Sequence, residues 1–314
     1  MDTTPEKVRI LIIGSGPAGY TAAIYAARAD CAPVLYTGIQ MGGQLTQTTD
    51  VENFPGFPQG IDGNMLMSQM EEQVRRLGAD IRMGMITSVK LAKEEGQPHL
   101  ITVDGEKQIE AQALIIATGA SARWLGIPSE DKYKGYGVSA CATCDGFFFR
   151  GKDVAVVGGG DSALEEASYL SKICNKVYLI VRRNVFRASK AMQTRVLNND
   201  KIEIIWNSQI DEIYGNEAVE GIRVKNSVDS AIRDIRLEGV FVAIGHHPST
   251  ELFTGQLELD AEGYIVTQGD TSLTTAPGVF AAGDVQDNRY RQAITSAGSG
   301  CKAAMDAEKY LIEL

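Results

Sequence analysis

A glycine-rich turn between an apolar segment and a helix-forming segment occurs twice in this chain, and it constrains the fold more than any other feature. The first apolar segment, residues 8–13, runs into Gly14-Ser15-Gly16-Pro17-Ala18-Gly19. The second, residues 153–157, runs into Gly158-Gly159-Gly160-Asp161-Ser162-Ala163. Such runs rich in Val and Ile are typical of strands buried on both faces of a parallel sheet. The sequence therefore predicts two nucleotide-binding α/β domains.

The spacing of these glycines, GxGxxG, suits the pyrophosphate of a dinucleotide. Such a turn aims backbone N–H groups and the positive end of a helix at the phosphates. Gly14 allows the tight turn, Gly16 the approach of the phosphate, and Gly19 the close packing of helix on strand. In the second copy Ala163 replaces the third glycine, which the pattern permits. The alternative is a tight turn without a ligand, but the strand–turn–helix context of both copies favours the nucleotide.

Two closing segments repeat in the same order as the glycine turns. Residues 113–119 close the first set of elements, and residues 239–245 close the second. Shorter apolar segments, such as 101–103 and 202–205, predict that each domain also carries a small antiparallel insertion.

The C-terminal region indicates that one domain is inserted into the other. Residues 279–284 predict a strand that enters a Gly-Asp turn, and a helix through Leu311 follows. Because the second domain already has a full set of elements, this region is expected to complete the first. The predicted fold class is α/β, with two Rossmann-like three-layer domains, the second inserted into the first. The first domain comprises residues 1–120 and 249–314, and the second comprises residues 121–248.

The two copies differ where the ribose of a dinucleotide would be read. An acidic residue is expected about 20 positions after the glycines, but segment 34–37 ends in Thr37. In the second copy, Arg182 and Arg183 follow the apolar segment, and Arg187 comes a turn later. Guanidinium groups suit a 2′-phosphate, so this set favours NADPH over NADH. A solvated arginine-rich face is the alternative.

Cys141-Ala-Thr-Cys144 is the one motif in which two cysteines are paired. At a predicted helix start, the helix dipole can lower the pKa of one thiol and make it nucleophilic. Asp145 follows directly and can carry the proton that the dithiol gains or loses. Half of a zinc site is the alternative, but it requires two further ligands with suitable spacing, and there is no second CxxC.

Histidines and further cysteines are sparse. His99 stands alone, and the adjacent His246 and His247 would point apart on an extended chain. With no histidine close to the CxxC in sequence, a Cys–His hydrolase would need a distant partner, which leaves hydride and thiol–disulfide transfer as the simpler chemistry. The remaining cysteines are expected to be small buried hydrophobes: Cys31, Cys174 and Cys301.

Charge and hydropathy exclude several classes of protein. A formal net charge of −10 argues against non-specific binding to nucleic acid or an anionic membrane. No apolar run approaches the roughly 20 residues of a membrane helix. The first apolar strand begins too early to leave room for a signal peptide. Five cysteines without regular spacing do not form a secreted disulfide framework. We therefore expect a cytoplasmic protein.

Together, the two glycine turns, the arginine set and the CATCD motif closely resemble the low-molecular-weight thioredoxin reductases of the class II pyridine nucleotide-disulfide oxidoreductases. The resemblance covers essentially all 314 residues. Two departures are present, since Val181 stands where many relatives have histidine, and Asp161-Ser162 replaces a common Asn-Thr. Other segments that carry the resemblance are Gly42-Gly43-Gln44-Leu45, Val51-Glu52-Asn53-Phe54-Pro55-Gly56, Gly283-Asp284 and Arg291-Gln292-Ala293.

This resemblance implies FAD in the first domain and NADPH in the inserted one. Electrons would pass from NADPH through FAD to a Cys141–Cys144 disulfide and then to oxidised thioredoxin. Cys144 would face the flavin, Cys141 would attack thioredoxin, and Asp145 would be the acid–base group. The implied candidate cofactor-binding residues are Gly14, Ser15, Gly16, Pro17, Ala18, Gly19, Thr37, Gly43, Gln44, Leu45, Asn53, Ala117, Thr118, Gly119, Gly158, Gly160, Asp161, Ser162, Ala163, Arg182, Arg183, Arg187, Gly245, Gly283, Asp284, Arg291, Gln292 and Ala293.

The resemblance further implies a homodimer and a rotation of the inserted domain between half-reactions, with hinges near residues 120–121 and 245–250. No metal, nucleic acid or membrane partner is expected. One alternative is a related reductase with a peroxiredoxin-linked or glutaredoxin-like partner, a group of which carries an extra N-terminal domain. A ferredoxin-fed relative would lack the arginine set. A non-catalytic flavoprotein sensor would be reduced once and then stop.

Overall fold

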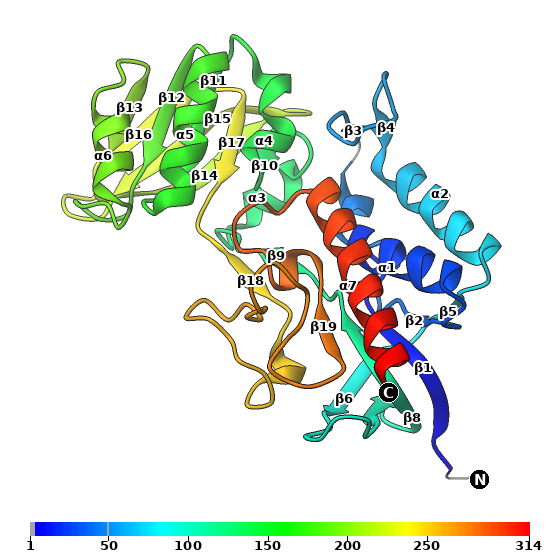
Figure 1. Ribbon diagram of the computed structural model, residues 1–314. Helices are drawn as coiled ribbons and strands as arrows, with labels where there is room; N and C mark the ends of the chain where they lie inside the picture. Colours follow the sequence, from blue (N-terminus) through cyan, green and yellow to red (C-terminus); the bar gives the residue numbers. More distant parts are fainter. Residues whose placement is uncertain (1–3, 49) are drawn as a thin grey trace. The chain divides into compact units, whose positions relative to one another are not determined.

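The computed structural model describes residues 4–48 and 50–314, and the chain separates into two compact units (Figure 1). The first unit combines the chain up to Ser121 with His247–Leu314, and the second is Ala122–His246. Two short paired strands, β9 (Ala120–Ala122) and β18 (His246–Pro248), lie where the chain passes between the units. The second unit is thus an insertion in the first.

The first unit is built on a sheet in the order β5-β2-β1-β8-β7-β6, with β19 also pairing with β8. Strands β5, β2, β1, β8 and β19 are parallel, whereas β6 and β7 form an antiparallel extension on β8. The strands are β1 (Glu6–Ile13), β2 (Val34–Tyr36), β5 (Asp80–Arg82), β6 (Ile86–Lys90), β7 (His99–Val103), β8 (Lys107–Ile116) and β19 (Val279–Ala281).

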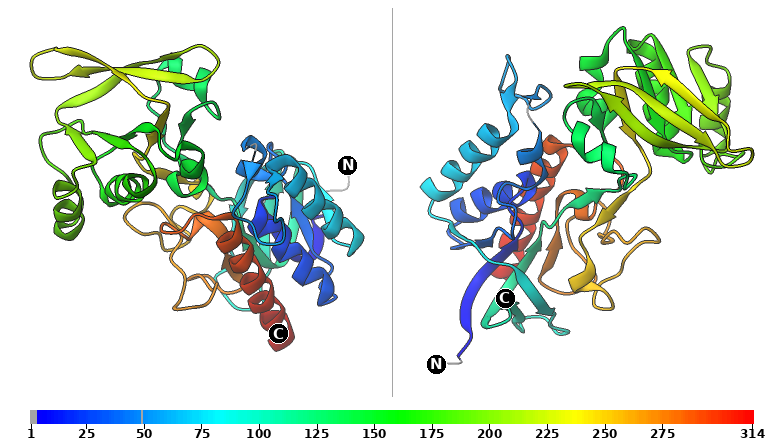
Figure 2. Two further views of the ribbon diagram at one scale, coloured as in Figure 1. Left: turned by 90° about the horizontal axis from the view of Figure 1, so that it is seen from above. Right: turned by 180° about the vertical axis from the view of Figure 1, so that it is seen from behind.

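Helices α1, α2 and α7 accompany this sheet, and both views in Figure 2 show α7 beside α1. Helix α7 closes the first unit although it lies at the other end of the chain. The helices are α1 (Pro17–Arg28), α2 (Gly63–Arg76) and α7 (Ala293–Glu313), the short 3₁₀ turns are η1 (Gly43–Gln47), η3 (Glu251–Phe253) and η4 (Gly283–Val285), and a separate two-stranded ribbon joins β3 (Asp50–Val51) and β4 (Ile61–Asp62).

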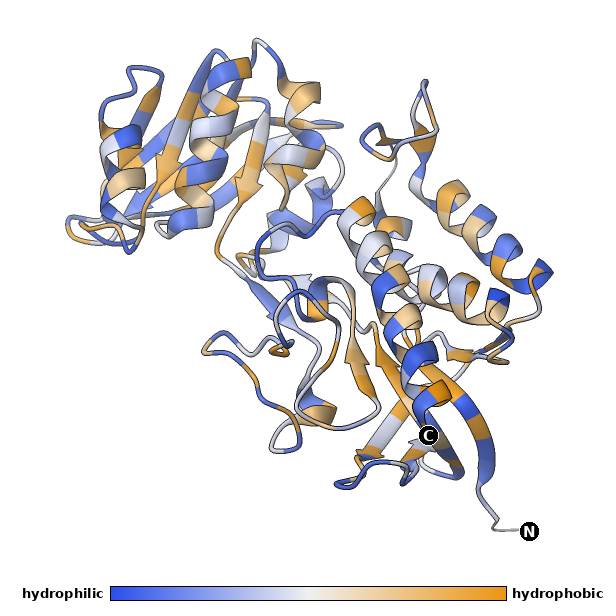
Figure 3. Cartoon of the chain, viewed as in Figure 1, coloured by the Kyte–Doolittle hydropathy of each residue, from blue (hydrophilic) through white to orange (hydrophobic). Residues whose placement is uncertain are grey.

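The apolar side chains of β1 alternate between the two hydrophobic cores of the first unit, one on each face of the sheet. Ile10 and Ile12 pack with the helices on one face, whereas Leu11 and Ile13 pack on the other face. Successive side chains of a strand point to opposite faces, so a continuous apolar run fills both. Figure 3 shows this apolar character along the central strands. Burial of each such side chain stabilises the fold by about 1.5–3 kcal/mol.

The inserted unit has a second parallel sheet in the order β10-β17-β11-β12-β13 and a three-stranded antiparallel sheet, β14-β15-β16. The parallel strands are β10 (Val138–Ser139), β11 (Asp153–Val157), β12 (Lys176–Ile180), β13 (Ile202–Ile205) and β17 (Gly239–Val242). The antiparallel strands are β14 (Ser208–Gly215), β15 (Val219–Asn226) and β16 (Ile232–Arg236). The helices are α3 (Pro128–Tyr133), α4 (Ala142–Asp145), α5 (Asp161–Ile173) and α6 (Lys190–Leu197), and η2 spans Gly146–Phe149.

The predicted fold class is confirmed, with one correction inside the second unit. Segment 202–205 was expected in the antiparallel insertion, but it forms β13 and pairs with β12 in parallel. The insertion is β14-β15-β16 instead. A short apolar run predicts a strand but does not indicate which strand it pairs with. The strand at 202–205 was therefore predicted correctly, but its sheet was not.

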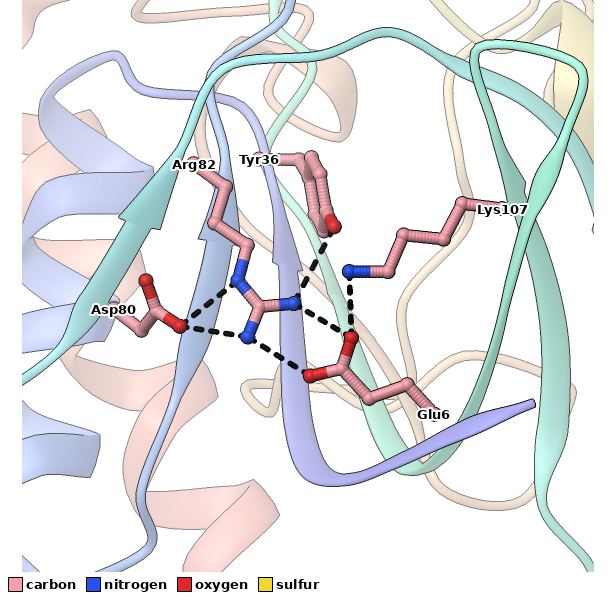
Figure 4. A network of polar contacts seen from close by, with 5 residues as sticks. All are labelled: Glu6, Tyr36, Asp80, Arg82 and Lys107. Atoms are coloured by element: carbon pink, nitrogen blue, oxygen red, sulfur yellow. Dashed lines mark hydrogen bonds and ion pairs between the residues drawn. The ribbon is translucent and has the colours of Figure 1, made fainter. Parts of the chain in front are cut away.

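A polar network joins the strands of the first unit (Figure 4). The Arg82 guanidinium binds both oxygens of Glu6 at 2.8 and 2.9 Å and also binds Asp80. Lys107 adds a contact of 2.7 Å to Glu6. Hydrogen bonds from Arg82 and Lys107 lower the pKa of Glu6 to about 2. The network therefore stays charged at neutral pH and connects β1, β5 and β8, although partly exposed pairs of this kind add little stability.

His99 is a buried titratable group in β7. It is 0% exposed, and its Nδ1 accepts a hydrogen bond of 3.1 Å from the backbone N–H of Ala92. This acceptor role leaves the ring neutral with its proton on Nε2, which makes no hydrogen bond of ordinary geometry within the described residues. Burial lowers the pKa of His99 to about 4, and the carbonyl of Gly278 opposes only part of that shift.

The neutral state of His99 predicts a loss of stability on acidification. Its folded pKa of about 4 lies below its ordinary value of 6.5, so the unfolded state binds more protons in between. The free energy of unfolding should fall by up to roughly 3 kcal/mol as the pH drops through this window. His99→Asn keeps an acceptor for Ala92 but does not titrate. The carboxyl groups titrate in both proteins, so their contribution cancels in the difference between the two stability curves. Denaturation midpoints of both proteins across the window should converge at low pH, whereas parallel curves would contradict the prediction.

Within residues 4–48 and 50–314, no helix is both long and apolar enough to span a bilayer.

Candidate redox and nucleotide-binding sites

The two cysteines of the CxxC motif form a disulfide at the start of α4. Their Cα atoms are 5.3 Å apart, and Cys141 is the N-cap of the helix. The backbone N–H groups of Cys144 and Asp145 donate to the carbonyl of Cys141 at 3.2 and 3.1 Å. A helix start was predicted here, but α4 is only 4 residues long before η2 follows. Its dipole is therefore that of one turn, and it contributes less than a long helix would.

Asp145 occupies a half-buried position in the same turn. Burial raises the pKa of Asp145, and a hydrogen bond from Ser139 acts in the opposite direction. A carboxyl group with a raised pKa holds its proton at a higher pH than an ordinary carboxyl group and is better suited to donate it. The Ser139 hydroxyl also accepts a hydrogen bond of 3.0 Å from the N–H of Cys141.

The first glycine turn has the geometry of an anion site. A Cβ on Gly14 would lie 2.2 Å from the Ala117 carbonyl oxygen, and one on Gly19 would lie 1.9 Å from that of Gly14. A Cβ on Gly16 would meet nothing within 4 Å. Gly16 is the N-cap of α1 and caps it with no side chain. Two glycines are therefore required by packing, whereas the third faces open space at the positive end of a helix, where a pyrophosphate fits.

Neighbouring loops are bound to this turn. The Ser15 hydroxyl donates to the carbonyl of Thr37 at 3.2 Å and accepts from the N–H of Gly42 at 3.0 Å. A Cβ on Gly43 would lie 3.2 Å from the Cα of Gly16. Because the carboxyl ends of β1, β2, β8 and β19 share one edge of the sheet, the loops after them come together.

Asp284 and Asn53 contact residues at the start of α7. The Ser296 hydroxyl donates to Asp284 Oδ1 at 2.8 Å, and the Asn53 amide donates to Gln292 Oε1 at 3.2 Å. Burial raises the pKa of Asp284 to about 6, and Ser296 opposes the shift. Arg291, just before the helix, has a left-handed φ of 46°. This conformation is uncommon for arginine and turns the chain into the helix.

The remaining candidates of the first unit follow β8 or lie in η1. Thr118 donates to the Ser249 carbonyl at 2.7 Å, and the Gln44 amide binds the carbonyl of Ala120. These contacts hold the segment that leads into β9. The structure brings the following predicted residues into the first unit: Gly14, Ser15, Gly16, Pro17, Ala18, Gly19, Thr37, Gly43, Gln44, Leu45, Asn53, Ala117, Thr118, Gly119, Gly283, Asp284, Arg291, Gln292 and Ala293.

The second glycine turn repeats this arrangement in the inserted unit. A Cβ on Gly158 would lie 2.4 Å from the Ala243 carbonyl oxygen, whereas one on Gly160 would meet nothing within 4 Å. Gly160 is the N-cap of α5, again without a side-chain cap. The tight glycine and the open glycine thus recur in the same order, and a second pyrophosphate fits here.

The arginine loop is attached to this second turn. The N–H of Arg187 donates to the Gly159 carbonyl at 2.7 Å, and Asp161 accepts from the N–H of Ser189 at 2.9 Å. Arg182, Arg183 and Arg187 are all exposed. The backbone contacts hold the loop against the glycine turn and leave the guanidinium groups available to a ligand. The second unit holds these predicted residues: Gly158, Gly160, Asp161, Ser162, Ala163, Arg182, Arg183, Arg187 and Gly245, with Cys141, Cys144 and Asp145.

Sequence reasoning missed two serines and misjudged one cysteine. Ser139 accepts a hydrogen bond from the N–H of Cys141, and Ser296 donates one to Asp284, but neither serine belongs to a motif that would have identified it. Cys31 and Cys174 are buried as expected, whereas Cys301 is half-buried, and its thiol contacts Met305 at 3.9 Å. Cys301 lies on α7, next to the buried Gly300 and the exposed Lys302.

Comparisons with known proteins agree with this geometry. The family described as pyridine nucleotide-disulphide oxidoreductase matches residues 8–300. A thioredoxin reductase of Mycolicibacterium smegmatis is 52% identical over 313 residues, which are 100% of this chain and 99% of that protein.

Solved structures lead to the same group. Thioredoxin reductase from Giardia duodenalis is 46% identical with a TM-score of 0.93, covering 98% of this chain and 99% of that one. The thioredoxin reductase of Streptococcus pyogenes is 39% identical with a TM-score of 0.92, covering 99% and 100%. The chain therefore belongs to the pyridine nucleotide-disulphide oxidoreductase family and, within it, to the thioredoxin reductases of low molecular weight.

Proposed function

We propose that this protein reduces the disulfide of oxidised thioredoxin at the expense of NADPH, with FAD as the resident cofactor. The observation that carries the proposal is the Cys141–Cys144 disulfide, next to the half-buried Asp145, in a unit that also holds a nucleotide-type glycine turn. The names of the relatives support thioredoxin as the substrate.

The first unit would hold FAD. Gly16 and the uncapped start of α1 would receive the pyrophosphate, and Asp284 and the start of α7 would face the polyol and ring portions. Asp284 Oδ1 accepts a hydrogen bond from Ser296, and Oδ2 would accept one from a ligand hydroxyl. Bound flavin supplies a hydride acceptor for a pyridine nucleotide and an electron donor for a disulfide.

The inserted unit would hold NADPH at Gly160 and the start of α5. Arg182, Arg183 and Arg187 would bind the 2′-phosphate, because exposed guanidinium groups on one loop offer several charge-assisted donors. Val181 is buried at 2% exposure, so the residue that replaces the common histidine would not reach this phosphate.

The dithiol would act by thiol–disulfide exchange. The Cys141 thiolate attacks one sulfur of the substrate disulfide and releases the other as a thiolate. Cys144 then attacks Cys141 Sγ, releases the second substrate sulfur and closes the Cys141–Cys144 disulfide. The dithiol loses two electrons and the substrate gains them. Asp145 would carry one of the protons that the substrate thiols take up.

Both the dithiol and the nicotinamide site belong to the inserted unit, and both must reach one flavin. We propose that this unit rotates between two half-reactions about the paired segments β9 and β18. We further propose that the protein is cytoplasmic and forms a homodimer. Sedimentation analysis would test the dimer.

The test is an anaerobic titration of the purified protein with NADPH, followed by oxidised thioredoxin, with the flavin absorbance as readout. The flavin should bleach with NADPH and recolour when thioredoxin is added, over many cycles. A flavin that stays oxidised would argue for a ferredoxin-fed enzyme. A single cycle of bleaching without turnover would argue for a sensor.

The arginine loop predicts the choice of pyridine nucleotide. Arg182→Ala combined with Arg183→Ala should raise the KM for NADPH by about 10- to 100-fold, because charge-assisted hydrogen bonds to the 2′-phosphate are lost. The activity with NADH should change little. Arg195→Ala, an exposed arginine on α6, is the matched control. Equal effects on both nucleotides would contradict this role.

A further inference from the structure

We propose that Trp206 is a positioning residue for the arginines of the inserted unit. Its indole ring packs on Phe186 and thereby holds the arginine loop, residues 182–187, in the conformation that receives a 2′-phosphate. This inference rests on the proposed function, in which that loop binds NADPH. It assigns a role to an aromatic pair that belongs neither to the glycine turn nor to the arginine set.

The arginine loop has one buried anchor. Among residues 182–187, all of which the structure describes, Phe186 alone is buried, at 6% exposure, and the other five residues are exposed. Phe186 belongs to the hydrophobic core that also contains Val181 and Leu164. The position of the loop relative to the parallel sheet therefore depends on how this single ring is held.

Trp206 is the aromatic partner of that ring. It directly follows β13, and the ring centroids of Phe186 and Trp206 are 4.4 Å apart at an interplanar angle of 54°. Aromatic pairs at this separation stabilise beyond the area that they bury. The carbonyl of Trp206 accepts from the Ser208 hydroxyl at 2.8 Å and from the Asn226 amide at 3.3 Å. Strands β14 and β15 thus hold the tryptophan, and the tryptophan holds the loop.

Backbone hydrogen bonds fix the two sides of the loop. The N–H of Asn207 donates to the Arg183 carbonyl at 3.3 Å, and the N–H of Arg187 donates to the Gly159 carbonyl at 2.7 Å. Phe186 lies between the two bonded arginines in the chain. Its ring contact therefore holds the stretch of loop that these two bonds span.

The charge of the loop makes such support important. Three guanidinium groups within six residues repel one another, which favours a more open loop in the absence of an anion. Each arginine that binds a phosphate also loses side-chain freedom. A loop that is already held in place loses less freedom on binding, so it binds the 2′-phosphate more tightly. The pyrophosphate position at Gly160 does not depend on these arginines.

The experiment compares two ligands that differ only in the 2′-phosphate. Adenosine 2′,5′-bisphosphate and adenosine 5′-monophosphate are titrated into the full-length flavoprotein by calorimetry, the weaker ligand by displacement of the stronger. The wild type should prefer the bisphosphate. Trp206→Ala should weaken binding of the bisphosphate about 10-fold and that of the monophosphate by less than about twofold, because the loop loses its aromatic contact.

Three further variants separate the ring contact from other effects of the substitution. Trp206→Phe keeps an aromatic ring and should restore the affinity for the bisphosphate to within about twofold of wild type. Phe186→Leu keeps an apolar side chain in the core and should reproduce the loss seen in Trp206→Ala. Trp124→Ala is the matched control, because this half-buried tryptophan of the same unit packs with Lys134, at 4.2 Å from its ring centroid. It should leave both affinities unchanged.

A combined variant tests whether Trp206 acts through the arginines. In a protein that already carries Arg182→Ala and Arg183→Ala, the addition of Trp206→Ala should weaken the bisphosphate by less than about threefold, because two of the groups that it positions are gone. A further loss of about 10-fold would show that the indole contacts the nucleotide itself, and it would overturn the positioning role.

Other outcomes would also overturn the inference. Unchanged affinity for the bisphosphate in Trp206→Ala or in Phe186→Leu would do so, as would equal losses for both ligands, which would indicate damage to the glycine turn. The titrations require neither turnover nor thioredoxin. A wild type that binds both ligands equally would overturn the choice of NADPH and this inference with it, whereas a preference that survives in the aromatic variants would overturn this inference alone.

Discussion

Cys144→Ser should lower the rate of NADPH-dependent thioredoxin reduction by about 10³-fold or more, since a protein with one thiol cannot close the Cys141–Cys144 disulfide and release its product. Cys141 is left to form a mixed disulfide that nothing resolves. The fold should be retained, because serine replaces cysteine in a half-buried turn with little change in volume.

The measurement separates the dithiol from the nucleotide sites. NADPH should still bleach the flavin of Cys144→Ser, but added thioredoxin should not recolour it catalytically. Cys301→Ser is the matched control, because this cysteine is half-buried on α7, outside the CxxC motif, and its thiol lies 3.9 Å from the Met305 sulfur. Full turnover by Cys144→Ser, or a comparable loss in Cys301→Ser, would contradict the role of the pair.

Gly19→Ala should destabilise the first unit by about 3 kcal/mol or more and lower the flavin content of the purified protein. A Cβ at this position would lie 1.9 Å from the carbonyl oxygen of Gly14, which is backbone and cannot rotate away. In an open helix the same change would stabilise by about 0.5–1 kcal/mol, so the clash decides the sign. The denaturation midpoint and the ratio of flavin to protein absorbance measure the two effects.

Gly16→Ala is the variant to compare with Gly19→Ala, because it places a methyl group in the same turn without a steric clash. Its Cβ meets nothing within 4 Å, and the backbone at Gly16 has a φ of −70°, which alanine adopts freely. The protein without its cofactor should unfold at the same temperature as the wild type, but the affinity for FAD should fall, because the methyl group would occupy the place of the pyrophosphate. Normal flavin affinity in Gly16→Ala would show that the pyrophosphate does not approach this glycine.

The local elements and their kind were predictable from short stretches of sequence. Continuous Val and Ile runs before glycine turns identified β1 and β11, and both helices start at the glycine turns as expected. The CxxC motif identified Cys141 and Cys144 as a pair, and they form a disulfide in the structure. These features depend on neighbours in the chain, so the sequence carries them directly.

The partners of each element were decided by the tertiary structure. Strand β13 belongs to the parallel sheet and not to the antiparallel one, because the pairing of a strand depends on strands that are distant in the sequence. Asn53 and Gln292 are 239 positions apart and meet through the packing of the first unit. The position of Ser139 beneath Cys141 arises from the pairing of β10 with β17, about 100 residues further along the chain.

The same division applies to the chemistry of the site. The sequence by itself determined which groups are present: two thiols, an adjacent carboxyl, three arginines and two phosphate-type turns. Only the tertiary structure decided how acidic those groups are, because burial and single hydrogen bonds set the pKa of Asp145 and of Asp284. Desolvation depends on every element that packs around a group, and no local pattern of residues records it.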